Sequence, residues 1–343
     1  MKVRKIGIVS LSSGVLGEDF VAHEVKIGLE RLKKYGIEVE FLPNSTKGIE
    51  FLKNNPEARA KDLIKAFKDD SIDMILCAIG GDDTYRLLPY LFENNELEKA
   101  VKQKIFLGFS DTTINHFMLN KVGIKTFYGQ AFLPDICELS NEMLPYSKHF
   151  FEELITYGKI KKIFPSDVWY NEREDFSEKA IGIPMEEHPN RGFELIRGNA
   201  KFEGKILGGC LESIFDIFDN TRYEDSVYLC KKYEIFPSLD EWKNKILLLE
   251  TSEEKPKPEL FRKMILKLEE YGIFDVISGL IIGKSQNEEY YEEYKQILLD
   301  EIKNKDLSIV YNINVGHSTP RCIIPFGVNA KVDIERQIIE FKE

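Results

Sequence analysis

The sequence lacks long apolar runs, a signal-like start and an excess of positive charge, and each absence excludes a class of protein. No apolar run in the 343 residues approaches the roughly 20 residues that a membrane-spanning helix requires, so we expect no membrane partner. The stretch Met1 to Gly7 contains no apolar signal region, so we expect a cytoplasmic protein. The formal net charge of −11 argues against a nucleic-acid partner, because that affinity depends on clustered lysine and arginine.

Cysteine and histidine are also few, and their spacing indicates neither a disulfide scaffold nor a metal site. No C-x-x-C pair occurs among the five cysteines, which are Cys77, Cys137, Cys210, Cys230 and Cys322. The absence of H-E-x-x-H argues against a metallopeptidase. The loop Ser12–Gly17 has neither G-x-G-x-x-G nor a Lys-Ser/Thr ending, which argues against a dehydrogenase or an ATPase. We therefore expect no metal and no cofactor.

The first ~130 residues alternate short apolar runs with helical patterns, which is typical of an α/β fold. The run Ile72–Ile79 is continuously apolar, as in strands that are buried on both faces of a parallel sheet. The apolar residues between Ala60 and Phe67 recur at helical spacing and predict a helix that faces this sheet. The other predicted strands are Ile6–Leu11, Ile37–Leu42 and Lys104–Phe109, and a further helix is expected over Thr84–Glu93.

The remainder of the chain divides into an irregular stretch and a strand-rich part. Tyr146–Pro189 has scattered prolines and no clean periodicity, which indicates an insertion or linker. Strands are predicted beyond it at Lys245–Leu249, Val276–Ile282, Ser308–Tyr311 and Val332–Phe341. We therefore expect a Rossmann-like parallel-sheet domain over residues 1–165, a linker over 166–189, and a strand-rich C-terminal α/β domain over 190–343.

Ser110 follows the predicted strand Lys104–Phe109, and a helix is predicted from Asp111 to about Lys121. A serine on such a strand-to-helix turn exposes its hydroxyl beside free backbone N–H groups and the positive end of the helix dipole. The sequence G-x-S-D meets the nucleophile-elbow pattern G-x-S-x-G only in part. Because serine and aspartate are also common helix N-caps, both interpretations stay open at this point.

A nucleophilic serine needs a base, and the base needs a group that orients it. Among the five histidines, His317 stands out because it follows the apolar stretch Ile309–Val315 and lies in a turn-rich loop. Glu250 ends the predicted strand Lys245–Leu249, at the sheet edge where α/β active sites form. A capping or surface glutamate is the alternative interpretation of Glu250.

Short sequence blocks in a fixed order extend over nearly the whole chain. They are Ala58–Leu63, Ile79–Asp83, Arg86–Tyr90, Gly108–Asp111, Arg197–Asn199, Gly204–Gly209, Leu249-Glu250, Gly316–Pro320 and Pro325–Gly327. Together they resemble the LD-carboxypeptidase family, which includes microcin-immunity peptidases. The resemblance implies a serine peptidase whose active site lies in the cleft between the two domains. It implies that Ser110 is the nucleophile, His317 the base and Glu250 the acid. We also expect a homodimer.

The resemblance also implies an oxyanion hole and a choice between two branches of the family. Backbone N–H groups of Asp111 and of the Gly80-Gly81 turn are expected to hold the oxyanion. The long segment between Ser110 and Glu250 favours the branch that hydrolyses peptidyl or aminoacyl nucleotides, and the predicted substrate-binding residues are Asp82, Phe193 and Arg321. That branch stacks the nucleobase on a tryptophan, which the matching block replaces with Phe193. For Arg321, an exposed loop arginine is the alternative. The alternative functions are a muropeptide carboxypeptidase that releases D-Ala from tetrapeptides, and a non-catalytic protein that binds a small ligand.

Overall fold

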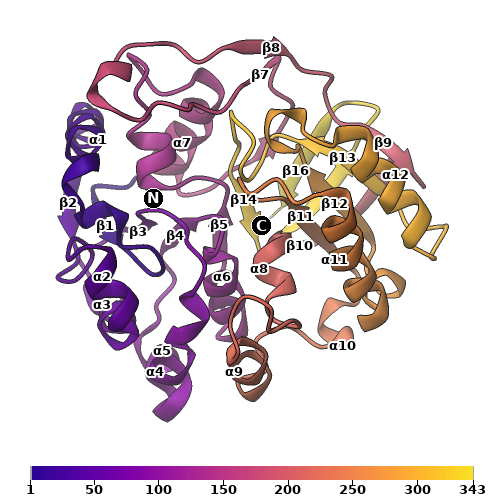
Figure 1. Ribbon diagram of the computed structural model, residues 1–343, viewed down its shortest axis with the longest axis horizontal. Helices are drawn as coiled ribbons and strands as arrows, with labels where there is room; N and C mark the ends of the chain where they lie inside the picture. Colours follow the sequence, from indigo (N-terminus) through magenta and orange to yellow (C-terminus); the bar gives the residue numbers. More distant parts are fainter. Residues whose placement is uncertain (1, 343) are drawn as a thin grey trace.

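The computed structural model describes residues 2–342 and contains two large sheets that lie next to each other (Figure 1). The first sheet is built mainly from the N-terminal half of the chain and the second mainly from the C-terminal half. The strands of the first sheet are β1 (Lys5–Val9), β2 (Glu38–Phe41), β3 (Met74–Cys77), β4 (Ile105–Gly108), β5 (Thr126–Tyr128) and β14 (Ile324–Phe326). The strands of the second are β6 (Lys162–Ile163), β9 (Glu194–Arg197), β10 (Lys201–Cys210), β11 (Lys245–Glu250), β12 (Gly279–Gly283), β13 (Ile309–Ile313), β15 (Asn329–Asp333) and β16 (Ile338–Lys342).

The first sheet has the strand order β14-β5-β4-β3-β1-β2, and β1 to β5 run parallel. All residues of β3 and β4 are buried because helices cover both faces of the sheet. Figure 1 shows α1 and α7 on one side of this sheet and α3 and α6 on the other. The helices in this part are α1 (Ala22–Lys34), α2 (Ile49–Asn54), α3 (Pro56–Lys68), α4 (Leu88–Phe92), α5 (Glu96–Ala100), α6 (Thr112–Lys121) and α7 (Pro145–Tyr157).

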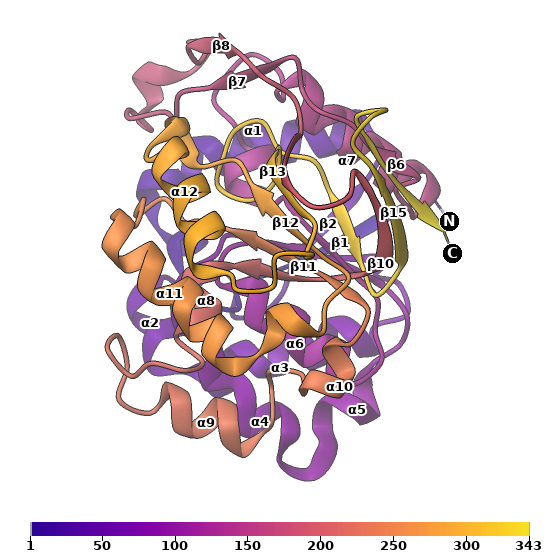
Figure 2. The same cartoon turned by 90° about the vertical axis from the view of Figure 1, so that its right-hand side faces the viewer.

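The second sheet has the order β6-β16-β15-β10-β11-β12-β13-β9, with a parallel centre from β10 to β13 and antiparallel pairs outside it. Figure 2 shows α11 and α12 next to each other along one side of this sheet. The ring of Phe261 on α11 stacks on that of Tyr294 on α12, with centroids 4.1 Å apart. The helices here are α8 (Leu211–Phe215), α9 (Ser226–Lys232), α10 (Leu239–Trp242), α11 (Pro258–Tyr271) and α12 (Tyr291–Glu301).

Each sheet takes one strand from the sequence range that was predicted for the other domain. Strand β14 pairs antiparallel with β5 in the first sheet, and β6 pairs with β16 in the second. Because β14 and β6 cross between the two halves of the chain, the two sheets are held together. The carboxyl ends of β4 and β11 can then contribute residues to the same site. The predicted α/β fold class, with a parallel N-terminal sheet and a strand-rich C-terminal part, is confirmed. The boundaries at residues 165 and 189 stay predictions.

Two local predictions were wrong. The stretch Tyr146–Pro189 is not irregular throughout, because α7 occupies its start and a hairpin of β7 (Val168–Tyr170) and β8 (Glu187–Pro189) occupies its later part. Helix α7 buries Phe150, Phe151 and Leu154, a helical spacing that the neighbouring prolines obscured. The predicted single strand Val332–Phe341 is instead the hairpin β15–β16.

A third expectation holds only in part. The predicted helix Thr84–Glu93 is a 3₁₀ turn, Thr84–Leu87, followed by the short helix α4. Over residues 2–342, no helix combines the length and the apolar character needed to cross a membrane.

Candidate active site

Ser110 lies on a strained turn between strand β4 and helix α6. Its φ of +64° is in the left-handed region, which residues other than glycine rarely adopt. Gly80, after strand β3, packs directly against this turn: a Cβ added there would lie 2.5 Å from both Cβ and Oγ of Ser110. The turn thus fixes the serine hydroxyl at the carboxyl edge of the parallel sheet, as a nucleophile elbow does.

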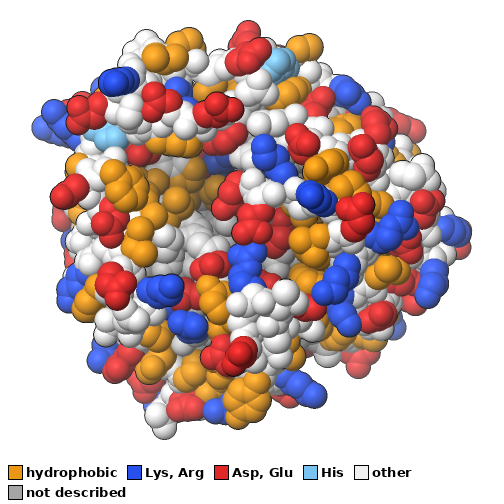
Figure 3. Space-filling view, in the orientation of Figure 1, with side chains coloured by type: hydrophobic (Ala, Val, Ile, Leu, Met, Phe, Trp, Pro, Cys, Tyr) orange, Lys and Arg blue, Asp and Glu red, His pale blue; other side chains and the backbone are white. Residues whose placement is uncertain are grey.

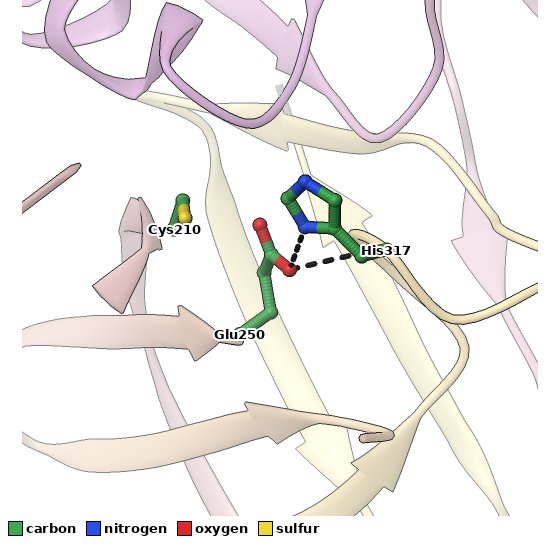
Figure 4. A group of neighbouring side chains, drawn as sticks. All are labelled: Cys210, Glu250 and His317. Atoms are coloured by element: carbon green, nitrogen blue, oxygen red, sulfur yellow. Dashed lines mark hydrogen bonds and ion pairs between the residues drawn. The ribbon is translucent and has the colours of Figure 1, made fainter. Parts of the chain in front are cut away.

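A continuous hydrogen-bond chain joins three side chains from distant parts of the sequence. Nε2 of His317 lies 3.0 Å from Oγ of Ser110. Nδ1 of His317 lies 2.7 Å from Oε2 of Glu250, and the same oxygen accepts the backbone N–H of His317 at 3.1 Å. Figure 4 shows the carboxylate of Glu250 directed at the imidazole. The structure therefore brings together the three residues predicted as nucleophile, base and acid, in the spatial order that acyl transfer requires.

The ends of strands β11 and β13, together with Gly316, determine where Glu250 and His317 lie. Glu250 is the last residue of β11, and His317 lies in the loop after β13, the second neighbour of β11 on the same side. Gly316 has φ +81°, and a Cβ there would lie 2.2 Å from Oε2 of Glu250. Only glycine allows the loop to pass this closely over the carboxylate. Both Glu250 and His317 are buried, which corrects the alternative of a surface glutamate.

Tyr128, at the end of β5, connects the nucleophile to the acid, and no sequence motif indicates it. Its hydroxyl donates to Oε1 of Glu250 at 2.6 Å and accepts the backbone N–H of Ser110 at 3.2 Å. Burial, and next the charge of Glu250, raise the pKa of Tyr128 well above its ordinary value. The phenol therefore stays protonated and holds the second oxygen of Glu250 in place.

Glu253 is a further carboxylate at the site that the sequence did not indicate. Its Oε2 lies 2.9 Å from Nε2 of His317, the same nitrogen that faces Ser110. Burial by itself lowers the pKa of His317, but the charges and hydrogen bonds of Glu250 and Glu253 outweigh it and raise the pKa to about 10. The hydrogen bond to His317 lowers the pKa of Glu253 to about 2. Two carboxylates against one imidazole therefore favour its protonated form.

The residues predicted to hold the oxyanion surround Ser110. Asp111 is the N-cap residue of α6, and its buried carboxylate accepts hydrogen bonds from Oγ of Ser12 and the N–H of Thr84. Burial, more than any other factor, raises the pKa of Asp111 to about 6. Gly80 touches Ser110 and Gly81 follows it with φ +150°. The backbone N–H groups of Asp111 and of the Gly80-Gly81 turn therefore lie near the serine hydroxyl. Their role in binding the oxyanion stays a prediction.

The three predicted substrate-binding residues lie in different environments. Asp82 is exposed next to the Gly80-Gly81 turn. Phe193 is only 4% exposed and belongs to the hydrophobic core, while its backbone exchanges two hydrogen bonds with Gln337. This ring therefore presents no free face for a nucleobase.

Arg321 is buried, which corrects the alternative of an exposed loop arginine. Its guanidinium pairs with Asp135 at 3.3 Å and donates to the backbone oxygen of His317 at 3.3 Å. It also donates to Oγ1 of Thr319 at 2.9 Å and lies over the ring of Phe109. Because the guanidinium is occupied by these contacts, its role in the structure is to hold the loop that carries His317.

Cys210, Glu250 and His317 are close enough together to be considered as metal ligands (Figure 4). Each is already engaged: the Cys210 thiol donates to Glu212, and the other two bond to each other and to Tyr128 and Ser110. Burial first, and then the charge of Glu212, raises the pKa of the Cys210 thiol well above its ordinary value. Because all three side chains already bond to protein partners, the cluster fits a hydrogen-bonded site better than a metal site.

Comparison with protein families identifies the chain. Residues 6–129 match the LD-carboxypeptidase N-terminal domain, and residues 203–332 match the LD-carboxypeptidase C-terminal domain. The chain belongs to the LD-carboxypeptidase family. It is thus a member of a peptidase family, and the resemblance seen in the sequence blocks is confirmed.

The chain is similar to a microcin self-immunity protein and to a probable murein peptide carboxypeptidase. A structure of an MccF-like protein from Streptococcus pneumoniae in complex with AMP is 65% identical, covers 99% of both chains and has a TM-score of 0.98. The microcin C7 self-immunity protein MccF of Escherichia coli is 22% identical over 92% of this chain and 87% of its own. A probable murein peptide carboxypeptidase of Bacillus subtilis is 23% identical over 88% of this chain and 82% of its own.

Proposed function

We propose that the protein is a serine hydrolase that cleaves the amide-type bond of peptidyl or aminoacyl nucleotides, in the manner of microcin-immunity peptidases. The observation that carries the serine chemistry is the hydrogen-bond chain from Glu250 through His317 to Ser110 on its strained turn. The nucleotide preference rests on the 65% identical MccF-like protein of Streptococcus pneumoniae, whose structure contains AMP. That likeness extends over 99% of both chains, so it includes the whole site.

The proposed reaction uses the site in two steps. Neutral His317 takes the proton of Ser110 through Nε2 as Oγ attacks the carbonyl carbon, and Glu250 stabilises the imidazolium that forms. Backbone N–H groups of Asp111 and the Gly80-Gly81 turn hold the oxyanion, and each such donor contributes about 2.7–4 kcal/mol. His317 then gives its proton to the leaving nitrogen, and an acyl group remains on Ser110. Water, activated by the same imidazole, releases the acid and restores the serine.

Ser110 and His317 each keep a small exposed surface. Figure 3 shows a hollow near the middle of this face, with acidic side chains along part of its rim. The site residues come from both halves of the chain, and Ser110 and His317 are 8% and 7% exposed. A substrate therefore needs to present a single extended acyl bond to the serine, which suits a small peptide or an aminoacyl nucleotide.

A side-by-side turnover assay tests the proposal. The substrates are aspartyl sulfamoyl adenosine and an L,D-linked muropeptide tetrapeptide, and the variants are wild type and Ser110→Ala. We expect hydrolysis of the nucleotide analogue by the wild type and its loss in the variant, with an unchanged circular dichroism spectrum. Preference for the tetrapeptide would replace the immunity-like function with cell-wall trimming. Binding without turnover in both proteins would favour a non-catalytic ligand-binding protein.

A further inference from the structure

Two side chains, Glu253 and Ser110, compete for one nitrogen of His317, the base of the proposed reaction. Nε2 of His317 lies 2.9 Å from Oε2 of Glu253 and 3.0 Å from Oγ of Ser110. An imidazole nitrogen carries one proton at most, so the contact with Glu253 uses the position through which the serine must give up its proton. The two partners differ in exposure, because the Glu253 side chain is 65% exposed whereas Ser110 is 8% exposed.

We propose that Glu253 is a resting-state clamp: in the free enzyme its carboxylate accepts Nε2–H of His317, at the position that a leaving group would take, and the substrate displaces it. This inference rests on the proposed function. Once Glu253 has moved, the Nε2 proton passes to water, and the bare nitrogen accepts the hydrogen bond from Ser110. Glu253 is thus a positioning residue that acts through His317, and it takes no part in bond breaking.

The loop that carries Glu253 is built so that only this side chain needs to move. Glu212 accepts hydrogen bonds from both the backbone N–H and the hydroxyl of Ser252, at 2.9 and 2.7 Å. The hydroxyl of Ser252 in turn accepts the N–H of Glu254 at 3.2 Å. The backbone on both sides of Glu253 is therefore held, while its carboxylate reaches over the site from the solvent side. Water competes for an exposed carboxylate, which makes the contact easy to exchange.

The clamp follows from the charges that face the imidazole. Glu250 approaches from β11 at Nδ1 and Glu253 from the next loop at Nε2. From the other elements, the neutral hydroxyl of Ser110 faces Nε2, and the Arg321 guanidinium, paired with Asp135, contacts only the backbone oxygen of His317. Two carboxylates against one imidazole favour the imidazolium, which is unable to act as a base. Removal of one of them lowers the pKa of His317.

The experiment compares Glu253→Gln with Glu254→Gln in the full-length protein. Glu254 is the neighbouring exposed glutamate and pairs with Arg222, so its variant removes the same charge without touching His317. The pH profile of kcat/KM reports the free enzyme, and that of kcat reports the complex. For Glu253→Gln we expect the acid limb of the kcat/KM profile to shift to lower pH by at least about one unit. At pH 7 this shift raises kcat/KM about tenfold. We expect kcat to stay within about twofold, since bound substrate has already displaced the carboxylate. Glu254→Gln should match the wild type.

A substrate-free measurement separates this inference from the proposed function. The imidazole of His317 is titrated by ¹⁵N NMR in histidine-labelled protein, with His317→Asn used for assignment. A lower pKa in Glu253→Gln than in the wild type supports the clamp, and an unchanged pKa overturns it. An equal fall of kcat and kcat/KM also overturns it, because Glu253 would then act in the transition state. If the wild type hydrolyses neither substrate, the proposed function fails, while the titration still decides the resting contact.

Discussion

Replacement of Tyr128 by phenylalanine removes one hydroxyl that serves both the nucleophile and the acid. The hydroxyl donates to Glu250 at 2.6 Å, accepts the N–H of Ser110 at 3.2 Å, and belongs to a side chain with no exposed surface. Loss of a hydrogen bond to a charged group costs about 1.5–3 kcal/mol, and an unsatisfied buried N–H costs about 1–3 kcal/mol. We therefore expect Tyr128→Phe to lower the free energy of unfolding by about 2.5–6 kcal/mol.

The same substitution should slow the reaction, because Glu250 then loses one of the three hydrogen bonds that orient it. If loss of this hydrogen bond raises the activation free energy by about 1.4–2.8 kcal/mol, kcat falls about 10- to 100-fold. Turnover of aspartyl sulfamoyl adenosine and urea unfolding measure the two effects in the same preparation. Tyr35→Phe is the matched control, since its hydroxyl donates to Glu152 at 2.8 Å on the distant pair α1 and α7. It should lose some stability and no activity. A Tyr128→Phe variant with wild-type kcat would refute the role given to the phenol.

Three further predictions concern the same site. Glu250→Gln keeps the shape of the acid but loses the charge that orients His317, so kcat should fall about 10⁴-fold in a discontinuous turnover assay. A fall of less than about tenfold contradicts the role of Glu250. Gly80→Ala places a Cβ 2.5 Å from Oγ of Ser110 and should lower kcat by about 100-fold with a smaller effect on KM, which Michaelis–Menten analysis separates. Dialysis against EDTA should leave kcat unchanged, because the proposed mechanism uses no metal, and a loss that zinc restores would reject that mechanism.

The parallel sheet and its active edge were predictable because their signals are local. Ile72–Ile79 is apolar throughout, as a strand covered on both faces must be, and Ser110 and Glu250 each follow directly on such a run. Residues at the carboxyl ends of parallel strands meet at one edge, which is why the order along the chain already indicated a shared site. His317 was found in the same way, through its turn-rich loop after an apolar strand.

Other features depend on contacts that no local pattern encodes. Tyr128 and Glu253 reach the site through side-chain directions and a loop path, so neither residue type nor spacing indicated them. The burial of Phe193 likewise results from its position beside the β15–β16 turn, where Gln337 holds its backbone. The break between β15 and β16 falls at the polar run Glu335-Arg336-Gln337, which separates the apolar positions of the two strands. The homodimer and the cytoplasmic location stay predictions.

Direct capture of the acyl-enzyme tests the central claim that Ser110 is the nucleophile activated by His317 and Glu250. The wild-type protein is mixed with aspartyl sulfamoyl adenosine, quenched with acid within the first turnovers, and mapped by peptide mass spectrometry. We predict an added aspartyl mass on the peptide that contains Ser110, and none in Ser110→Ala, which should also release no nucleoside. Turnover without any adduct on that peptide, or continued release of the nucleoside by Ser110→Ala, would contradict the mechanism.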